Sequence, residues 1–232
     1  MPDSFEQPSS QEANPKGKQW EDTLQSLDLI TDRLSHPIEP GIKEVCAAFI
    51  VNGLPTTQSC EGHFDDHGLP YPWVDIGPSN DNFDDDLKTK IDFVDRTHRT
   101  ASKKAEEEIL SHFGVDEIDY DDKKMVSYFD KILEENLGTL YHQYEEEIRG
   151  EERKLTQEYI EKLVDIFKMY KPLDPRFVYS FTISYSKTRI RVKPLNAQFD
   201  KASESEKKVI LEKTRLEISH IGQILKNIFF SN

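Results

Sequence analysis

The spacing of apolar and polar positions predicts helices over most of the chain. Apolar residues recur every three or four positions from Trp20 to Leu34 and again from Pro40 to Gly53, which is typical of amphipathic helices. The last predicted helix begins with Ser203 and Glu206, a pair typical of an N-terminal capping box. The same spacing predicts helices over residues 89–113, 122–135, 137–170 and 203–230.

Short extended segments interrupt the helical pattern in two places. Residues 56–60 and 71–76 flank a polar loop, and residues 177–185 alternate aromatic or β-branched side chains with smaller polar ones before residues 188–192 return after a short turn. Such segments are typical of paired strands. Because strands and helices do not alternate strictly, the sequence predicts an α+β fold, in which a small, mostly antiparallel sheet of two strand pairs is covered by helices.

The same pattern predicts the domain organisation. Residues 1–18 are polar and have no apolar period, so we expect a disordered tail. Residues 19–232 are expected to form a single α+β domain with a long helical insertion at about 89–170. The long helices of this insertion are candidates for binding a protein partner or for self-association.

Charge restricts the partners of this protein. The chain of 232 residues carries 30 Lys and Arg against 44 Asp and Glu, a formal net charge of −14. This balance disfavours nucleic acid as a partner, because binding a phosphate polymer depends on converging basic side chains. Four basic residues are an exception, since alternate positions of a strand share one face: Lys187, Arg189, Arg191 and Lys193. They predict either an ordinary solvated strand face or an anion-binding surface.

Other features bear on the compartment. No segment approaches the roughly 18 consecutive apolar residues that a membrane span requires, and the acidic N-terminus lacks the order of a signal peptide. The two cysteines, Cys46 and Cys60, provide no disulfide framework. We therefore expect a soluble cytoplasmic protein with no membrane partner.

Reactive side chains are concentrated between Thr57 and Gly68. Within this segment, a tight turn at Gly62 would direct Cys60, His63 and His67 toward one point, and a thiolate with imidazoles suits Zn²⁺. Three protein ligands leave a coordination position for water, which the metal acidifies into a nucleophile. The candidate bases for that water are Glu61, Asp65 and Asp66.

Two other interpretations of this segment stay open. Cys60 and His63 are candidates for a catalytic thiolate–imidazolium pair, with Glu61 as a third catalytic candidate. Alternatively the loop is purely structural, with Gly62 making the turn. If a ligand pocket exists, its candidate lining residues are Ser59, Trp73, Arg189 and Arg191, and an arginine there would hold a phosphate through two hydrogen bonds.

A family resemblance adds to these expectations. A helix ending at Asn52-Gly53 is followed by Ser59-Cys60-Glu61-Gly62-His63 and then by Pro72-Trp73-Val74-Asp75-Ile76. This order resembles the Ser-Cys-x-Gly-His segment of small uncharacterised bacterial and phage proteins. It is more distantly similar to the wybutosine-synthesising tRNA methyltransferase family, and the likeness covers about residues 38–77.

The two families differ in what they imply. Ser59, Cys60 and Gly62 match the Ser-Cys-Ser-Gly-Arg motif of the methyltransferases, whereas His63 stands in place of its arginine and Glu61 in place of its second serine. The resemblance implies an α/β or α+β sheet with the motif at a strand end, and it raises the possibility of RNA modification. The uncharacterised proteins supply no activity.

Three functions follow as hypotheses from these observations. The first is a zinc-dependent hydrolase, or a binder of a small phosphorylated or nucleotide-like ligand, acting at residues 59–67. The second is a non-enzymatic interaction module that uses its long helices. The third is an RNA-modifying enzyme.

Overall fold

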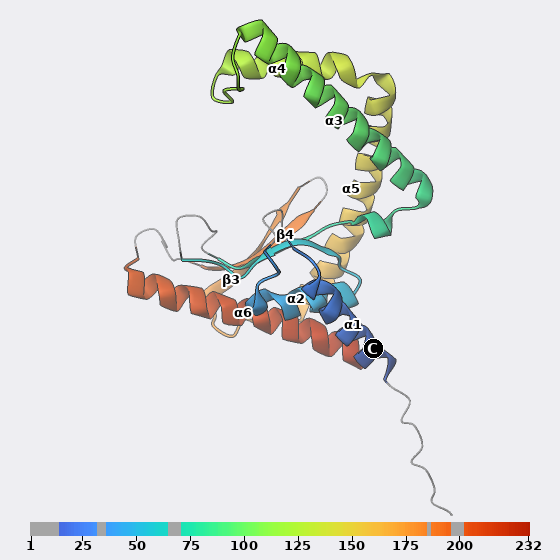
Figure 1. Cartoon of the computed structure of the whole chain (residues 1–232). Coiled ribbons are helices and arrows are strands. Elements are labelled where there is room, and N and C mark those ends of the chain that lie inside the picture. The colour runs from blue at the N-terminus through green and yellow to red at the C-terminus, as the bar shows by residue number, and fades with distance from the viewer. Residues whose placement is uncertain (1–13, 32–35, 65–70, 185–186, 196–201) are drawn as a thin grey trace, which may run out of the picture. The chain divides into compact units, whose positions relative to one another are not determined.

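The computed structural model of this protein has an α+β fold (Figure 1). It describes residues 14–31, 36–64, 71–184, 187–195 and 202–232. The elements in chain order are α1 (Pro15–Asp28), α2 (Pro40–Val51), β1 (Thr56–Cys60), β2 (Trp73–Ile76), a 3₁₀ turn (Asn80–Asn82), α3 (Asp85–Phe113), α4 (Lys123–Leu137), α5 (Thr139–Lys168), β3 (Phe177–Ile183), β4 (Thr188–Pro194) and α6 (Glu204–Ser231).

The strands form one four-stranded sheet in the order β1-β2-β4-β3. All three pairings are antiparallel. The two predicted strand pairs join through β2 and β4, where Val74 lies opposite Ile190. The predicted α+β class and antiparallel sheet are therefore confirmed, with both pairs in one sheet.

Helices α2 and α6 pack against each other and against one face of this sheet (Figure 1). Strand side chains at alternate positions provide the apolar layer beneath them, since alternate residues point to the same face. An ideal Cβ at Gly222 of α6 would lie 3.1 Å from the Cα of Val45 in α2. Glycine there permits the close helix contact. The buried apolar residues that β2 and β4 contribute to this layer are Val74, Ile76, Ile190 and Val192.

The end of α5 covers the β3 side of the same face. Phe167 packs against Tyr179 and Phe181, with ring centroids 4.4 and 5.1 Å apart. Offset and edge-to-face ring pairs of this kind add to the energy of apolar burial. The face of the sheet that the helices cover therefore forms the hydrophobic core, and the polar side chains lie on the opposite face.

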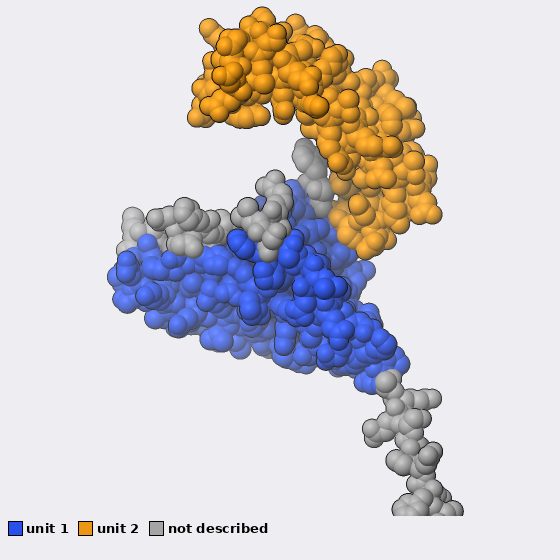
Figure 2. Space-filling model, in the orientation of Figure 1, with its two compact units in different colours: residues 1–77, 159–232 blue, residues 78–158 orange. Residues whose placement is uncertain are grey.

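The chain divides into two compact units (Figure 2). Unit 1 comprises residues 1–77 and 159–232 and contains the sheet. Unit 2, residues 78–158, contains α3, α4 and the first part of α5. Its small core is formed by Ala101, Leu137 and Tyr141, with Phe93, Val94 and Leu133 packed around them.

Several helix ends differ from the sequence prediction. Helix α1 begins at Pro15, inside the predicted tail, because the Asn14 side chain accepts a hydrogen bond from the Lys16 N–H at 3.1 Å. It ends at Asp28 and not at Leu34, because the N–H groups of Leu29 and Ile30 bond to carbonyls three residues back and close the last turn. The remainder of the predicted tail, residues 1–13, lies outside the described residues.

Asp84, the residue before α3, caps the N-terminus of this helix. The Asp84 carboxylate accepts a hydrogen bond from the Leu87 N–H at 2.8 Å, so α3 begins at Asp85, four residues before the predicted start. At the C-terminal helix, the predicted capping box of Ser203 and Glu206 is confirmed. Among the described residues, no helix has the length and apolar content needed to cross a lipid bilayer.

Candidate functional site

A sharp bend in the backbone follows the end of β1 and shapes the candidate site. Gly62 has a φ of +84°, a conformation that side chains other than glycine rarely adopt. An ideal Cβ at Gly62 would lie 2.8 Å from Cδ1 of Leu211 and 3.0 Å from the backbone nitrogen of Pro72. Only glycine therefore fits this bend, which the sequence predicted as a turn. The bend directs the neighbouring residues back toward the start of α2.

Three potential metal ligands meet at this bend. One ligand atom each from Glu39, Cys60 and His63 lies within 4.8 Å of the others, and all three residues are half-buried. These residues could hold a metal ion. The structure thus brings together the predicted Cys60 and His63 and adds Glu39, the residue before α2. The third predicted ligand, His67, lies outside the described residues, as do Asp65 and Asp66.

Glu39 connects the other members of the cluster. One of its oxygens contacts Nε2 of His63, and the other accepts a hydrogen bond from the Glu61 N–H at 2.6 Å. The first contact orients the imidazole ring, and the second attaches the segment before α2 to the bend. A carboxylate, a thiol and an imidazole are the ligand types that zinc accepts in proteins.

Glu61 is held in place from two sides. Its Oε2 accepts a hydrogen bond from the Gly41 N–H at 3.0 Å, and its Oε1 accepts one from Nη2 of Arg215 at 2.9 Å. Arg215 also donates to the backbone carbonyls of Glu61 and Gly62, at 3.1 and 2.7 Å. Because both carboxylate oxygens are engaged, Glu61 acts in this arrangement as a positioning residue that joins α2, the bend and α6.

The surroundings of Cys60 favour its neutral thiol. Burial raises the pKa of this thiol; the Gly62 N–H, 3.3 Å from Sγ, opposes the rise, and the nearby Glu39 carboxylate adds to it. A free catalytic thiolate generally needs the reverse, a depressed pKa next to positive charge. A bound cation would supply that positive charge and deprotonate the thiol.

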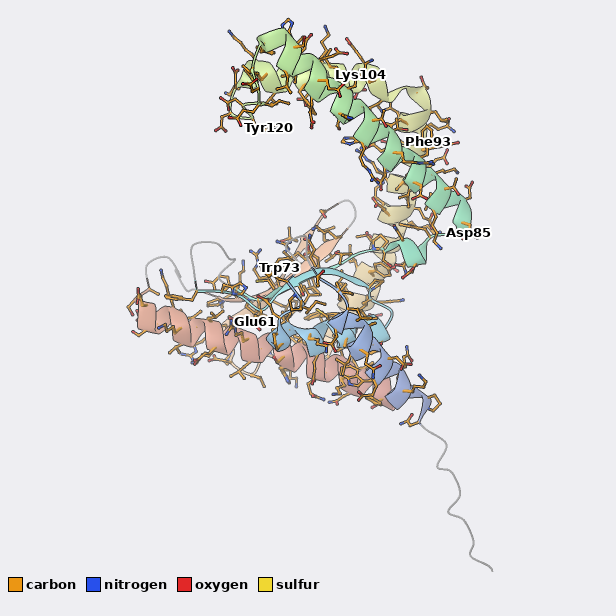
Figure 3. The ribbon with its side chains drawn as sticks, viewed as in Figure 1. Glu61, Trp73, Asp85, Phe93, Lys104 and Tyr120 are labelled. Carbon is orange, nitrogen blue, oxygen red and sulfur yellow. The ribbon has the colours of Figure 1, made fainter. Side chains whose placement is uncertain are left out.

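Cys60 also belongs to a row of side chains across the polar face of the sheet. Cross-strand partners in an antiparallel sheet share a face, and Cys60 is paired with Trp73, Trp73 with Arg191, and Arg191 with Ser180. The candidate metal cluster therefore lies at the β1 end of a row that contains two predicted ligand-binding residues. Figure 3 labels Trp73 on the sheet and Glu61 at the adjoining bend.

The neighbouring row contains a buried ion pair. Asp75 is fully buried and accepts hydrogen bonds from Nε and Nη2 of Arg189 at 2.7 and 2.8 Å. Lys187 contacts the same carboxylate at 2.8 Å. Burial alone would raise the pKa of Asp75, but the hydrogen bonds from Arg189 and Lys187 outweigh it and the net pKa is lowered. The guanidinium of Arg189 also lies 3.6 Å from the centroid of the Trp73 ring.

Two buried donors on this face have no partner among the described residues. They are Nε1 of Trp73 and Nε of Arg191. Burial lowers the pKa of Arg191, and the positive charge of Arg189 acts in the same direction. Arg189 and Arg191 have equivalent positions in the sequence pattern, but they differ in the structure: Arg189 is paired with Asp75, whereas Nε of Arg191 has no hydrogen-bond partner among the described residues.

Ser59 lies apart from the other candidate residues. It is paired with the core residue Val74, which places it on the helix side of the sheet. There its hydroxyl hydrogen-bonds to the buried thiol of Cys46 in α2. The structure therefore brings together Cys60, Trp73, Arg189 and Arg191 on one face and separates Ser59 from them.

Comparison with known proteins adds no assignment. No family model, curated protein or solved structure matched this chain. The resemblances to uncharacterised bacterial and phage proteins and to the wybutosine-synthesising methyltransferases stay predictions. The geometry of the site is therefore the basis for inferring function.

Sequence reasoning missed Glu39, Arg215 and Asp75. Glu39 and Arg215 are distant from the bend along the chain and reach it only through the positions of α2 and α6. Asp75 had a local signal, because a carboxylate inside an otherwise apolar strand needs a partner. That partner is Arg189, which lies opposite Asp75 on β4, the strand with basic residues at alternate positions.

Proposed function

We propose that this protein is a zinc-dependent hydrolase acting on a small phosphorylated ligand, with Glu39, Cys60 and His63 as its zinc ligands. The observation that supports the proposal is the approach of one carboxylate oxygen, one thiol sulfur and one imidazole nitrogen to within 4.8 Å of one another. These atoms come from two separate segments of the chain. A merely structural loop would not require this mixture of ligand types.

Three ligands among the described residues are compatible with a catalytic zinc site. Structural zinc sites are closed by four protein ligands, whereas catalytic sites keep a position for water and lower its pKa. In hydrolysis of a phosphate ester, water oxygen bonds to phosphorus, the bond from phosphorus to the leaving oxygen breaks, and a proton passes to that oxygen. Glu39, Glu61 and Arg215 hold the bend in shape for this reaction through their mutual hydrogen bonds.

The sequence also suggested a thiolate–imidazolium pair. The raised pKa of Cys60 disfavours that pair, because a free catalytic thiolate needs a lowered pKa. The interaction-module and RNA-modification hypotheses stay predictions, since no described contact favours either one over zinc binding.

Metal content is the first test. The full-length chain should be purified without chelators, and its zinc should be measured by inductively coupled plasma mass spectrometry. We expect stoichiometric zinc in the wild type and its loss in Glu39→Gln, Cys60→Ala and His63→Ala. Cys46→Ala is the matched control, because this second cysteine is buried in α2 away from the cluster and its removal should leave zinc bound.

Hydrolysis is the second test. Zinc-loaded wild type should release phosphate from p-nitrophenyl phosphate or from a nucleotide panel. A chelator should abolish this activity, and added zinc should restore it. Zinc-free wild type that also fails to take up added zinc contradicts the proposal, as does zinc retention in all three ligand variants.

A further inference from the structure

The polar face of the sheet carries two buried donors that no described residue accepts. Nε1 of Trp73 and Nε of Arg191 come from residues paired directly across β2 and β4. A buried donor without an acceptor costs free energy, and natural proteins usually satisfy such groups with protein, water or ligand atoms. Both atoms are buried, so an acceptor would reach them only when neighbouring side chains move, and two such donors on paired residues indicate where it would bind.

The charge of the same face favours an anionic acceptor. Lys187, Arg189, Arg191 and Lys193 supply four positive charges, and Asp75 supplies one negative charge. Asp75 is already engaged by Lys187 and Arg189. Arg191 makes no ion pair with any described residue. Among the described residues, no carboxylate is paired with its charge, even though the whole chain is strongly acidic.

We propose that Trp73 and Arg191 form a subsite for the phosphoryl group of a small ligand. A tetrahedral phosphoryl group presents several oxygens, so separate N–H donors on adjacent strands can each bind one. The hydroxyl of Ser180, paired with Arg191 on β3, supplies another donor in the same row. Guanidinium groups are well suited to phosphate because their planar donors are fixed and always charged.

The row places this subsite beside the candidate metal cluster. Cys60 is paired with Trp73, and adjacent strands in a sheet are separated by about 4.8 Å. Arg191 is two strands away from Cys60, about 10 Å across the sheet, so a phosphoryl group between the two side chains would lie within reach of both. The inference rests on the proposed function in assigning both groups to one site, but binding of the oxyanion itself can be measured in metal-free protein.

Tryptophan fluorescence provides a direct test, because Trp20 and Trp73 are the two tryptophans of the chain. In a Trp20→Phe background, Trp73 is the sole tryptophan, and inorganic phosphate should change its emission saturably in chelator-treated protein at low ionic strength. Arg191→Gln in this background should weaken phosphate binding by about tenfold or more. Lys193→Gln is the matched control, since it removes the same charge from an exposed position on β4 and should leave the affinity nearly unchanged.

A second variant tests the subsite independently in case Arg191→Gln does not fold. Trp73→Phe keeps one aromatic ring and removes the N–H donor together with the second ring, so it should weaken phosphate binding measured by equilibrium dialysis while circular dichroism stays unchanged. Acetate at equal ionic strength should bind much more weakly than phosphate. Equal losses in Arg191→Gln and Lys193→Gln, no binding by the wild type, or equal affinity for acetate would each overturn the subsite.

The results for metal and phosphate are separable. Phosphate binding that depends on Arg191, in a protein that never takes up zinc, would support the subsite and refute the proposed zinc function. Stoichiometric zinc without any phosphate binding would refute the subsite and leave the metal site intact.

Discussion

Arg215 of α6 donates hydrogen bonds to both the side chain and the backbone carbonyl of Glu61, at 2.9 and 3.1 Å. This contact joins the C-terminal helix to the bend after β1. The Glu61 carboxylate in turn accepts a hydrogen bond from the Gly41 N–H at the start of α2. The position of the candidate metal ligands therefore depends on Arg215, which is remote from them in the sequence. Its hydrogen bonds go to Glu61 and Gly62 and not to the ligands themselves.

Replacing Arg215 should weaken zinc binding without removing a ligand. Arg215→Ala should lower zinc affinity by about tenfold, as is common for residues that orient metal ligands. It should also lower the free energy of unfolding by about 1–2 kcal/mol, because its hydrogen bonds are charge-assisted but partly exposed. Competition with a fluorescent zinc chelator and urea denaturation measure the two effects. Arg215→Lys keeps the charge but not the multiple contacts, so full rescue by lysine would contradict this role.

Gly62 should tolerate no side chain. Gly62→Ala combines a positive φ with a Cβ that meets Leu211 and Pro72, so the free energy of unfolding should fall by about 2–3 kcal/mol. The matched control is Gly150→Ala. Gly150 lies inside α5 with nothing within 4 Å of an ideal Cβ, and alanine there should stabilise the protein by about 1 kcal/mol. Thermal denaturation of both variants tests the contrast, and equal effects would refute it.

Asp75 should make stability dependent on acid pH. Its folded pKa is lowered from the ordinary value of 3.8, so its stabilising contribution is complete above that value and is lost as pH falls through the lower folded pKa. Asp75→Asn leaves Arg189 and Lys187 without a buried anion and should cost about 2–3 kcal/mol at pH 7. In urea denaturation, the difference from wild type should shrink as the pH falls below 3.8. Asp81→Asn, at an exposed position, should show no comparable difference at either pH.

The buried carboxylate of Glu217 should depend on Tyr170. Tyr170 donates to Oε2 of Glu217 at 2.5 Å, and the Asp174 N–H donates to Oε1 at 2.7 Å. Burial and the Glu217 carboxylate both raise the pKa of Tyr170, so the hydroxyl stays protonated as a donor. Tyr170→Phe should lower the free energy of unfolding by about 1–3 kcal/mol, because it leaves a buried acceptor unsatisfied.

A double-mutant cycle isolates this contact. The combined Tyr170→Phe and Glu217→Gln protein should be more stable than the sum of the single losses predicts. Tyr120→Phe is the control, since Tyr120 is largely exposed and should lose little stability. Strict additivity of the two single substitutions would show that their hydrogen bond contributes nothing to folding.

The main elements could be predicted from local patterns. Apolar spacing located α2 through Ile42, Val45 and Phe49, and these residues are buried as the pattern requires. Helix ends were less predictable, because Asn14 and Asp84 start helices through side-chain hydrogen bonds that periodicity does not detect. The joining of the two strand pairs through β2 and β4 was also beyond a local pattern, since it depends on contacts between distant segments.

The candidate site could be predicted only in part. Cys60 and His63 are close in sequence, so a turn at Gly62 was enough to predict that they meet. Ser59 was assigned to the same site, but the alternation of a strand placed it on the opposite face, next to Cys46. Arg189 and Arg191 looked equivalent until Asp75 paired with the first.

The sequence alone determined the α+β class, the turn at Gly62 and the basic stripe on one strand face, because each depends on residues near one another along the chain. Only the tertiary structure decided that Glu39 joins Cys60 and His63, and that Nε of Arg191 has no partner within the described part of the chain. The physical reason is that ligation and ion pairing act over a few ångströms in space. Those distances are set by how the helices and strands pack, which spacing along the chain does not specify.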